Sequence, residues 1–131
     1  MKQNPLSGSA ALSQLLAKMN DEGSFPISVL TDRQGLPIAF AAAPGYDPDR
    51  QSAVVALVQK TATQVSGHLG METDEITLNA ADGQRLVCRP FEVSGNQLIL
   101  AVMVGKRAQT HRRLTTQTIR NITQVWKSYW E

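Results

Sequence analysis

Hydrophobic positions along the chain alternate between a helical spacing and short strand-like runs. Near the N-terminus, four apolar residues recur three and four positions apart: Leu12, Leu15, Leu16 and Met19. This spacing predicts an amphipathic helix with Ser9 as its N-cap. A helical spacing returns in a long central segment and again near the C-terminus, and glycine turns divide the apolar runs between them. The predicted order is helix, two strands, long helix, three strands and helix.

Turn and capping residues set the bounds of these elements. The first helix meets a stop signal at residues 20–23, where glycine can adopt the left-handed conformation. The long helix starts at residues 47–49, whose acidic side chains suit a helix N-terminus, and it reaches Leu69. The last helix covers residues 110–129. The predicted strands cover residues 25–31, 36–43, 75–79, 84–93 and 97–104.

The strands differ in how apolar they are, which predicts their places in a sheet. Residues 98–104 are continuously apolar, so this strand is expected at the centre with both faces covered. The strand with Ile76 and Leu78 is short and half polar, which suits an edge with unpaired backbone groups. The predicted fold class is α+β, α-β-β-α-β-β-β-α. It has a five-stranded antiparallel sheet with the long helix on one face and the terminal helices on the other.

The long helix has an unusually wide apolar face. One side carries the residues expected to pack on the sheet: Val54, Val58, Thr61, Val65 and Leu69. Val55 and Leu57 flank that side in opposite directions. A helix with so wide an apolar face needs cover from more than one direction. Two interpretations stay open: a well-buried crossover helix, or a helix that also packs against a partner molecule.

Composition limits the class of protein. The chain has 131 residues, 42% hydrophobic and 18% charged, which fits one domain (residues 9–131) after a flexible segment (residues 1–8). The net charge of +2 is too small to imply nucleic acid as a partner. A single cysteine, Cys88, excludes an intramolecular disulfide, and no apolar run is long enough to be a signal peptide or a membrane span. A cytoplasmic location is expected.

No catalytic or cofactor site is predicted. His68 and His111 have no metal ligands at suitable sequence spacing, and the glycines form no phosphate-binding loop. Cys88 is expected to be a buried small hydrophobe rather than a nucleophile. Basic residues gather before the last helix: Lys106, Arg107, His111, Arg112 and Arg113. They form either a solvated loop or a surface that attracts an acidic protein partner.

The first strand pair carries the segment Leu30-Thr31-Asp32-Arg33-Gln34-Gly35-Leu36-Pro37-Ile38-Ala39. Its aspartate, the glycine three residues later and the isoleucine-alanine pair resemble the roadblock/dynein light chain family. The long second helix, the Gly83 turn and the strand of residues 98–104 support this resemblance, which covers most of the chain. Family members are small adaptor domains, many of which act on or beside small GTPases.

The resemblance implies a non-enzymatic homodimer or heterodimer that binds or regulates a small Ras-like GTPase, with no cofactor. Dimers of this family join through the second helix and the third strand. The expected interface residues here are Val54, Leu57, Val58, Thr61, Ile76 and Leu78. An alternative is a ligand-binding sensory domain of the PAS or GAF type. Those domains usually place several short helices where this chain has one long helix.

Overall fold

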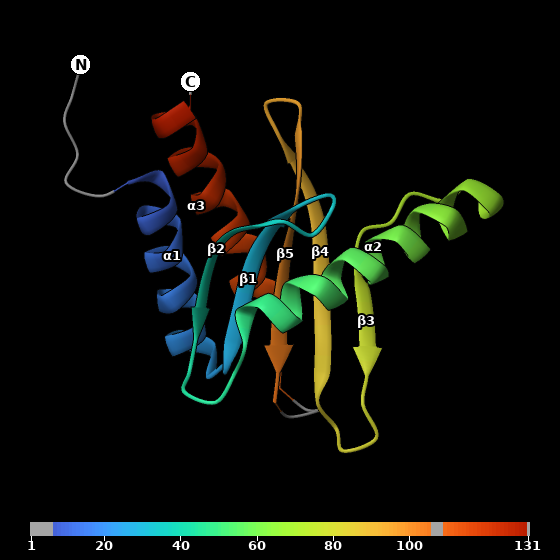
Figure 1. The fold of residues 1–131 in the computed structure, drawn as a ribbon, viewed down its shortest axis with the longest axis horizontal. Coiled ribbons are helices and arrows are strands. Elements are labelled where there is room, and N and C mark those ends of the chain that lie inside the picture. The colour runs from blue at the N-terminus through green and yellow to red at the C-terminus, as the bar shows by residue number, and fades with distance from the viewer. Residues whose placement is uncertain (1–6, 106–108, 131) are drawn as a thin grey trace.

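The fold of the chain was obtained as a computed structural model that describes residues 7–105 and 109–130 (Figure 1). The eight predicted elements are present in the predicted order. They are α1 (Gly8–Gly23), β1 (Ile27–Asp32), β2 (Pro37–Ala42), α2 (Pro48–Leu69), β3 (Ile76–Asn79), β4 (Arg85–Val93), β5 (Asn96–Val104) and α3 (Arg112–Trp130).

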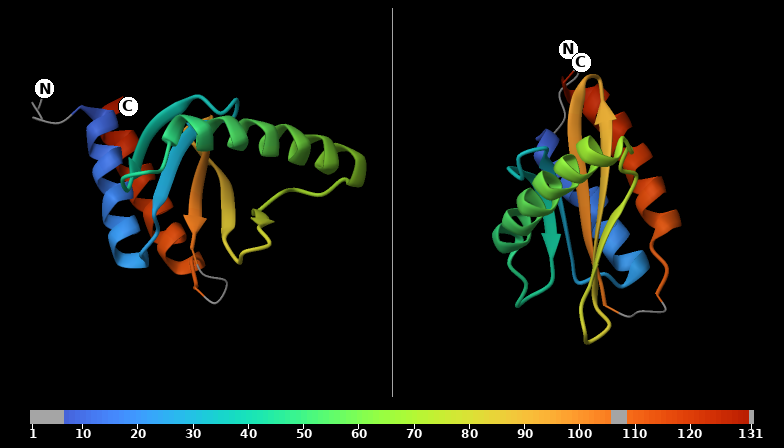
Figure 2. Two further views of the ribbon diagram at one scale, coloured as in Figure 1. Left: turned by 60° about the horizontal axis from the view of Figure 1, so that its bottom comes forward. Right: turned by 90° about the vertical axis from the view of Figure 1, so that its right-hand side faces the viewer.

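The strands form one antiparallel sheet in the order β2-β1-β5-β4-β3. The apolar strand β5 lies at the centre and the half-polar strand β3 lies at an edge, which confirms both predictions. Helix α2 crosses one face of the sheet, while α1 and α3 pack side by side on the other (Figure 2). The predicted α+β fold class is therefore confirmed.

Each face of the sheet has its own core. The larger core lies under α1 and α3 and includes Leu12, Leu16, Leu30, Leu100 and Ile122. The smaller core lies under α2 and consists of Val29, Val55, Leu86, Cys88, Ile99 and Ala101. Alternating residues of β5 enter the two cores, because successive side chains of a strand point to opposite faces.

The ends of α1 differ from the predicted ones. Ser7, not Ser9, is the N-cap, and its hydroxyl accepts a hydrogen bond from the N–H of Ala10 at 3.1 Å. At the other end Ser24, not Gly23, has the left-handed backbone, with φ 54°. Gly23 is small for a different reason: a Cβ there would lie 2.3 Å from the ring of Phe25. Packing of that ring, rather than backbone conformation, therefore requires this glycine.

The predicted flexible segment, residues 1–8, overlaps this helix. Residues 1–6 lie outside the described part of the chain, whereas Ser7 caps α1 and Gly8 begins it. Gly8 lies directly beneath the indole of Trp130, since a Cβ on it would approach that ring to 2.4 Å. The start of α1 and the end of α3 are thus packed together.

The β1–β2 turn fixes where α2 crosses the sheet. The carboxylate of Asp32 accepts hydrogen bonds from the N–H groups of Gln34 and Leu36, and Gly35 takes a positive φ of 85°. A Cβ on Gly35 would lie 2.5 Å from the Cβ of Ala56 in α2. The turn glycine therefore serves both the backbone conformation and the close approach of the helix.

Only the first half of α2 packs on the sheet. Its buried residues are Gln51, Ser52 and Val55, and the Gln51 amide donates to the carbonyl of Ala101 in β5 at 3.2 Å. The expectation that Thr61, Val65 and Leu69 also pack on the sheet is wrong, because all three are exposed, Val65 at 45% and Leu69 at 63%. The helix has 22 residues and extends past β3, so its second half has no strand beneath it (Figure 1).

Candidate interaction site

A groove of about 800 Å³ lies between residues 54–65 of α2, the connection of residues 70–75, and β3. Six of its lining residues are the predicted interface residues: Val54, Leu57, Val58, Thr61, Ile76 and Leu78. Arg112, from the predicted basic cluster, also lines it. The fold thus brings seven candidate residues from three distant segments to one surface.

The groove is apolar at both its floor and its rim. Val54, Val58 and Ile76 are half-buried at the floor and pack against the core under α2. The rim carries side chains that a globular domain normally covers: Leu57 is 67% exposed, Met71 57%, Leu78 46% and Val65 45%. A contiguous exposed apolar surface of this kind marks a site of protein or ligand interaction.

The strand beside the groove has an open edge. β3 pairs with β4 through four antiparallel residue pairs, from Ile76 with Cys88 to Asn79 with Arg85. No other strand within the described ranges pairs with its outer side. Such an edge presents unpaired N–H and C=O groups to a further strand.

The opposite edge strand, β2, is covered. Helix α1 lies along it, and two α1 side chains bond to its backbone. The Asn20 amide donates to the carbonyl of Ala41 at 3.0 Å, and the Ser13 hydroxyl accepts from the N–H of Phe40 at 3.4 Å. Of the two sheet edges in the described ranges, the β3 edge is therefore the one that combines an open strand with an adjoining apolar groove.

A cluster of charged groups closes one end of the groove. Glu75, which immediately precedes β3, lies between the side chains of two arginines and one histidine from other segments. Its Oε1 is 3.2 Å from His111 Nε2, 3.1 Å from Arg112 Nη1 and 4.0 Å from Arg89 Nε. Arg112 also reaches Asp74 with a 2.8 Å contact. The carboxylates of the 70–75 connection thus neutralise cations of β4 and of the α3 N-terminus.

These contacts shift the pKa values of the cluster. Burial raises the pKa of Glu75, but hydrogen bonds and charges from His111 and Arg112 lower it more, so the net pKa lies below its usual value. Burial, together with the like charge of Arg112, lowers the pKa of Arg89, whereas Asp74 and Glu75 oppose that change. Hydrogen bonds to Asp74 and Glu75 raise the pKa of Arg112. The cluster therefore favours the ionised form of Glu75.

The predicted partner-binding cations have different surroundings. Lys106 and Arg107 lie outside the described residues. Arg112 is engaged by Asp74 and Glu75, so its charge is largely neutralised within the molecule. Arg113 is exposed in the first turn of α3. The described part of the basic cluster is thus mainly an internal electrostatic contact.

The remaining candidate groups, Cys88 and His68, form no nucleophilic or metal-binding site among the residues that the structure describes. Cys88 is 1% exposed, and burial raises the pKa of its thiol to about 12, so it is not a nucleophile. His68 is exposed in the last turn of α2. Among the residues that the structure describes, no three His, Cys, Asp or Glu side chains gather as a metal site would require. None of the helices in the described ranges is both long and apolar enough to cross a membrane.

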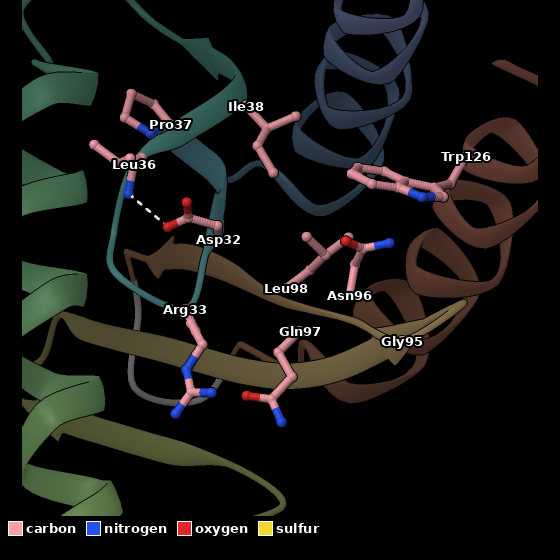
Figure 3. A pocket seen from close by; sticks show the side chains of 10 residues that line it. All are labelled: Asp32, Arg33, Leu36, Pro37, Ile38, Gly95, Asn96, Gln97, Leu98 and Trp126. Carbon is pink, nitrogen blue, oxygen red and sulfur yellow. Dashed lines mark hydrogen bonds between the residues drawn. The ribbon is translucent and has the colours of Figure 1, made fainter. Parts of the chain in front are cut away.

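A second hollow, of about 620 Å³, lies at the end of the sheet between the β1–β2 turn, the β4–β5 turn and α3 (Figure 3). Trp126 reaches from α3 toward Ile38, whereas Arg33 and Gln97 extend on the other side. The Asp32 carboxylate is occupied by its own turn, as the bond to Leu36 shows. This hollow offers no pair of acid and base groups that face one another.

Sequence reasoning missed the charged residues at the groove. Glu75 and Arg89 are 14 positions apart in the chain and become neighbours only through the pairing of β3 with β4. One available signal was Arg89 itself, a charged residue that directly follows the apolar run Leu86-Val87-Cys88. A cation buried at 8% exposure requires a nearby partner.

The whole fold is similar to several solved structures. MglB of Myxococcus xanthus matches with a TM-score of 0.78 and 14% identity, over 100% of this chain and 96% of that one. Gliding protein MglB of Thermus thermophilus matches with a TM-score of 0.74 and 13% identity, over 97% and 99%. A Roadblock/LC7 domain from Streptomyces avermitilis matches with a TM-score of 0.64 and 20% identity, over 89% and 95%.

These likenesses extend over most of each protein and show that the chain has the roadblock/LC7 fold. The fold expected from the first hairpin and the order of elements is thereby confirmed. No protein-family model matches the sequence, and no curated protein is similar to it at a significant level. Because identities of 13 to 20% establish shape alone, function has to be argued from the site.

Proposed function

We propose that this chain is a non-enzymatic cytoplasmic interaction module that forms a homodimer through the α2–β3 groove and binds or regulates a small Ras-like GTPase. The observation that carries the proposal is the coincidence, at one edge, of an open strand and an exposed apolar groove. Either feature alone is common, but together they match what a second copy of the same surface would cover.

Self-association follows from the geometry of that edge. A second β3, placed antiparallel beside the first, would satisfy the unpaired backbone groups and join the two sheets. The same arrangement would place α2 of the second copy against Leu57, Val65 and Met71. Their apolar surface would then be removed from water. A two-fold axis makes both contacts at once, as expected for an isologous interface.

The comparisons support self-association. The structural neighbours are MglB, described as a gliding protein, and a Roadblock/LC7 domain, and one MglB structure shows a tetrameric arrangement. The resemblance of the first hairpin to the roadblock family points to a small GTPase as the partner. This support is by analogy of fold, so a direct test of the partner is needed.

A non-enzymatic role agrees with the chemistry of the described residues. The thiol of Cys88 is buried with a raised pKa, and the charged cluster around Glu75 is internally paired. Cys88 packs in the core under α2, and the contacts of Glu75 lie at the end of the groove. They provide no reacting centre.

The alternative, a ligand-binding sensory domain, has less support. One uninterrupted helix joins β2 to β3, and it approaches the sheet closely where Ala56 meets Gly35. Sensory domains of the PAS or GAF type need space between that connection and the sheet. Native mass spectrometry of the purified protein tests this alternative, since a copurified small molecule would favour it.

Sedimentation velocity tests the dimer. Wild type is expected to show a concentration-dependent monomer–dimer equilibrium. Leu57→Asp and Ile76→Asp are expected to sediment as folded monomers, because each places a charge in the buried interface. Dimers unchanged in both variants would contradict the proposed surface.

Affinity capture tests the GTPase. The immobilised protein is incubated with lysate of its own cells containing excess GTP analogue or GDP, and the retained proteins are identified. A Ras-like GTPase retained in one nucleotide state, and then bound by the purified protein in a direct titration, is the expected result. Retention only of itself or of unrelated proteins would remove the GTPase part of the proposal.

A further inference from the structure

Strand β3 has less support than any other strand of the sheet. It has four residues and pairs only with β4, and its outer residues Leu78 and Asn79 are exposed. On the α2 side, only Ile76 reaches the core. A short strand with so few contacts should exchange readily between paired and detached states.

Glu75 attaches the start of this strand to the opposite face of the sheet. Glu75 immediately precedes the strand and lines the end of the groove, as Ile76 and Arg112 also do. There its carboxylate contacts His111 and Arg112 at the beginning of α3 and lies 4.0 Å from Arg89 of β4. One side chain therefore links β3 to two other elements.

Arg89 shows why this carboxylate matters. Arg89 is 8% exposed, and its guanidinium donates from Nη1 to the hydroxyls of Thr115 and Thr116 at 2.9 and 2.7 Å. Its Nε has no hydrogen-bond partner and instead faces Glu75 at 4.0 Å. Glu75 is thus a counter-charge for a buried cation, and its removal leaves that cation without this compensation.

The α3 N-terminus adds to the same attraction. Its first turn has no acidic residue and begins with Arg112 and Arg113, although the positive end of a helix dipole disfavours cations. The compensating carboxylates are Asp74 and Glu75, which come from the connection before β3. The charges that stabilise this helix end therefore also hold the edge strand.

We infer that Glu75 is a positioning residue for self-association: it holds β3 against β4 and α3 so that the edge beside the groove can pair with a second copy. This inference rests on the proposed homodimer. It makes the dimer depend on a residue at the end of the groove, through the contacts of its carboxylate with Arg89, His111 and Arg112.

The ionisation of Glu75 gives this attachment a pH dependence. The groups that face Glu75 are Arg89 from β4, His111 and Arg112 from the start of α3, and, beside Arg112, Asp74 from its own connection. The pKa of Glu75 is lower in the folded protein than in the unfolded chain. Its contribution is therefore complete above the unfolded pKa, about 4.3, and is lost as pH falls through the lower folded value.

The test compares Glu75→Gln with wild type and with Glu22→Gln. Glu22 is an exposed carboxylate of α1, so its change removes the same charge away from the cluster. Hydrogen exchange of residues 76–79 is measured at high dilution, and the dimer dissociation constant is measured by sedimentation between about pH 7 and about pH 3. Thermal unfolding confirms that each variant folds.

Glu75→Gln is expected to speed exchange in β3 at least about tenfold and to raise the dissociation constant by a similar factor. Its dissociation constant should also change less than that of wild type as pH falls below about 4.3. Glu22→Gln should match wild type in all three measurements. Unchanged β3 exchange in Glu75→Gln, or an unchanged dissociation constant and pH profile, would overturn the inference.

The oligomeric states of wild type and of Glu75→Gln together distinguish a failure of this inference from a failure of the proposed function. If wild type dimerises and Glu75→Gln dimerises equally well, the homodimer stands and the role of Glu75 is wrong. If wild type stays monomeric at every concentration, the homodimer is wrong, and with it the control of self-association by Glu75. Exchange in dilute protein then still decides whether Glu75 holds β3.

Discussion

The two halves of α2 both carry apolar residues but have opposite environments. In the first half, Val55 is fully buried and Ala56 contacts the β1–β2 turn at Gly35. In the second half, Val65 and Leu69 are largely exposed, and the helix forms one wall of the groove. An apolar stripe that continues past the edge of its own sheet indicates that the fold alone does not use all of it.

The two edges of the sheet repeat this contrast. At β2, helix α1 covers the strand and bonds to its backbone through Ser13 and Asn20. At β3, the chain provides no comparable cover within the described ranges. Proteins usually protect exposed edges, so an unprotected edge beside an exposed helix favours an intermolecular contact.

The largest expected difference is between Asp substitutions in the two environments. Val55→Asp buries an unpaired charge and should destabilise the fold by about 3–5 kcal/mol, a large part of a typical domain's stability. Leu57→Asp, two residues away, should change monomer stability by no more than about 1 kcal/mol. Chemical denaturation at dilute concentration measures both, and equal losses would contradict the burial of one face of α2 and the exposure of the other.

A smaller effect is expected at the turn under the first half of α2. Gly35→Ala places a Cβ 2.5 Å from Ala56, whereas Gly45→Ala, also at a positive φ, meets open space. Gly35→Ala should therefore cost about 1–3 kcal/mol more than Gly45→Ala, because both share the backbone strain and only one overpacks. Equal unfolding free energies would show that α2 does not approach the turn closely.

The smallest expected change concerns the end of the helix. Leu69→Ala should alter the stability of the monomer by less than about 0.5 kcal/mol, since the side chain is 63% exposed. Urea unfolding measures it, with Leu16→Ala in the core as the comparison. Leu16 is fully buried, so its truncation should cost about 2–5 kcal/mol.

The thiol of Cys88 can report opening of the β3 edge without any substitution in the protein. It lies in the core under α2, directly opposite Ile76 in the β3–β4 ladder. With a pKa of about 12 and almost no exposure, its thiol should resist a disulfide reagent at about pH 8 until the protein is unfolded. Rapid labelling of the native protein would mean that the β3 edge opens far more than the structure indicates.

The strength of each local signal decides how much the sequence could predict. The element order, the central β5 and the edge strand β3 follow from the apolar runs and glycine turns, and the structure confirms them. The helix end at Ser24 was missed because Gly23 resembles a conformational stop signal. Ser24 has the left-handed backbone, and Gly23 instead leaves room for the ring of Phe25. Only the packed structure shows this contact.

The candidate site was predictable in part. Helical periodicity identified Leu57 and Val58, and strand alternation identified Ile76 and Leu78, but periodicity cannot show where a long helix leaves its sheet. That is why Val65 and Leu69 were expected to be packed and are exposed. The contact of Glu75 with Arg89 depends on strand pairing, which individual residues do not encode.

The most direct test of the central claim is hydrogen exchange of wild type at concentrations below and above the point of dimer formation. We predict that protection rises with concentration in residues 76–79 and in the second half of α2, and stays constant in α1. This result would place the contact at the open edge and groove. Concentration-dependent protection confined to α1 and α3, or none at any concentration, would contradict the account.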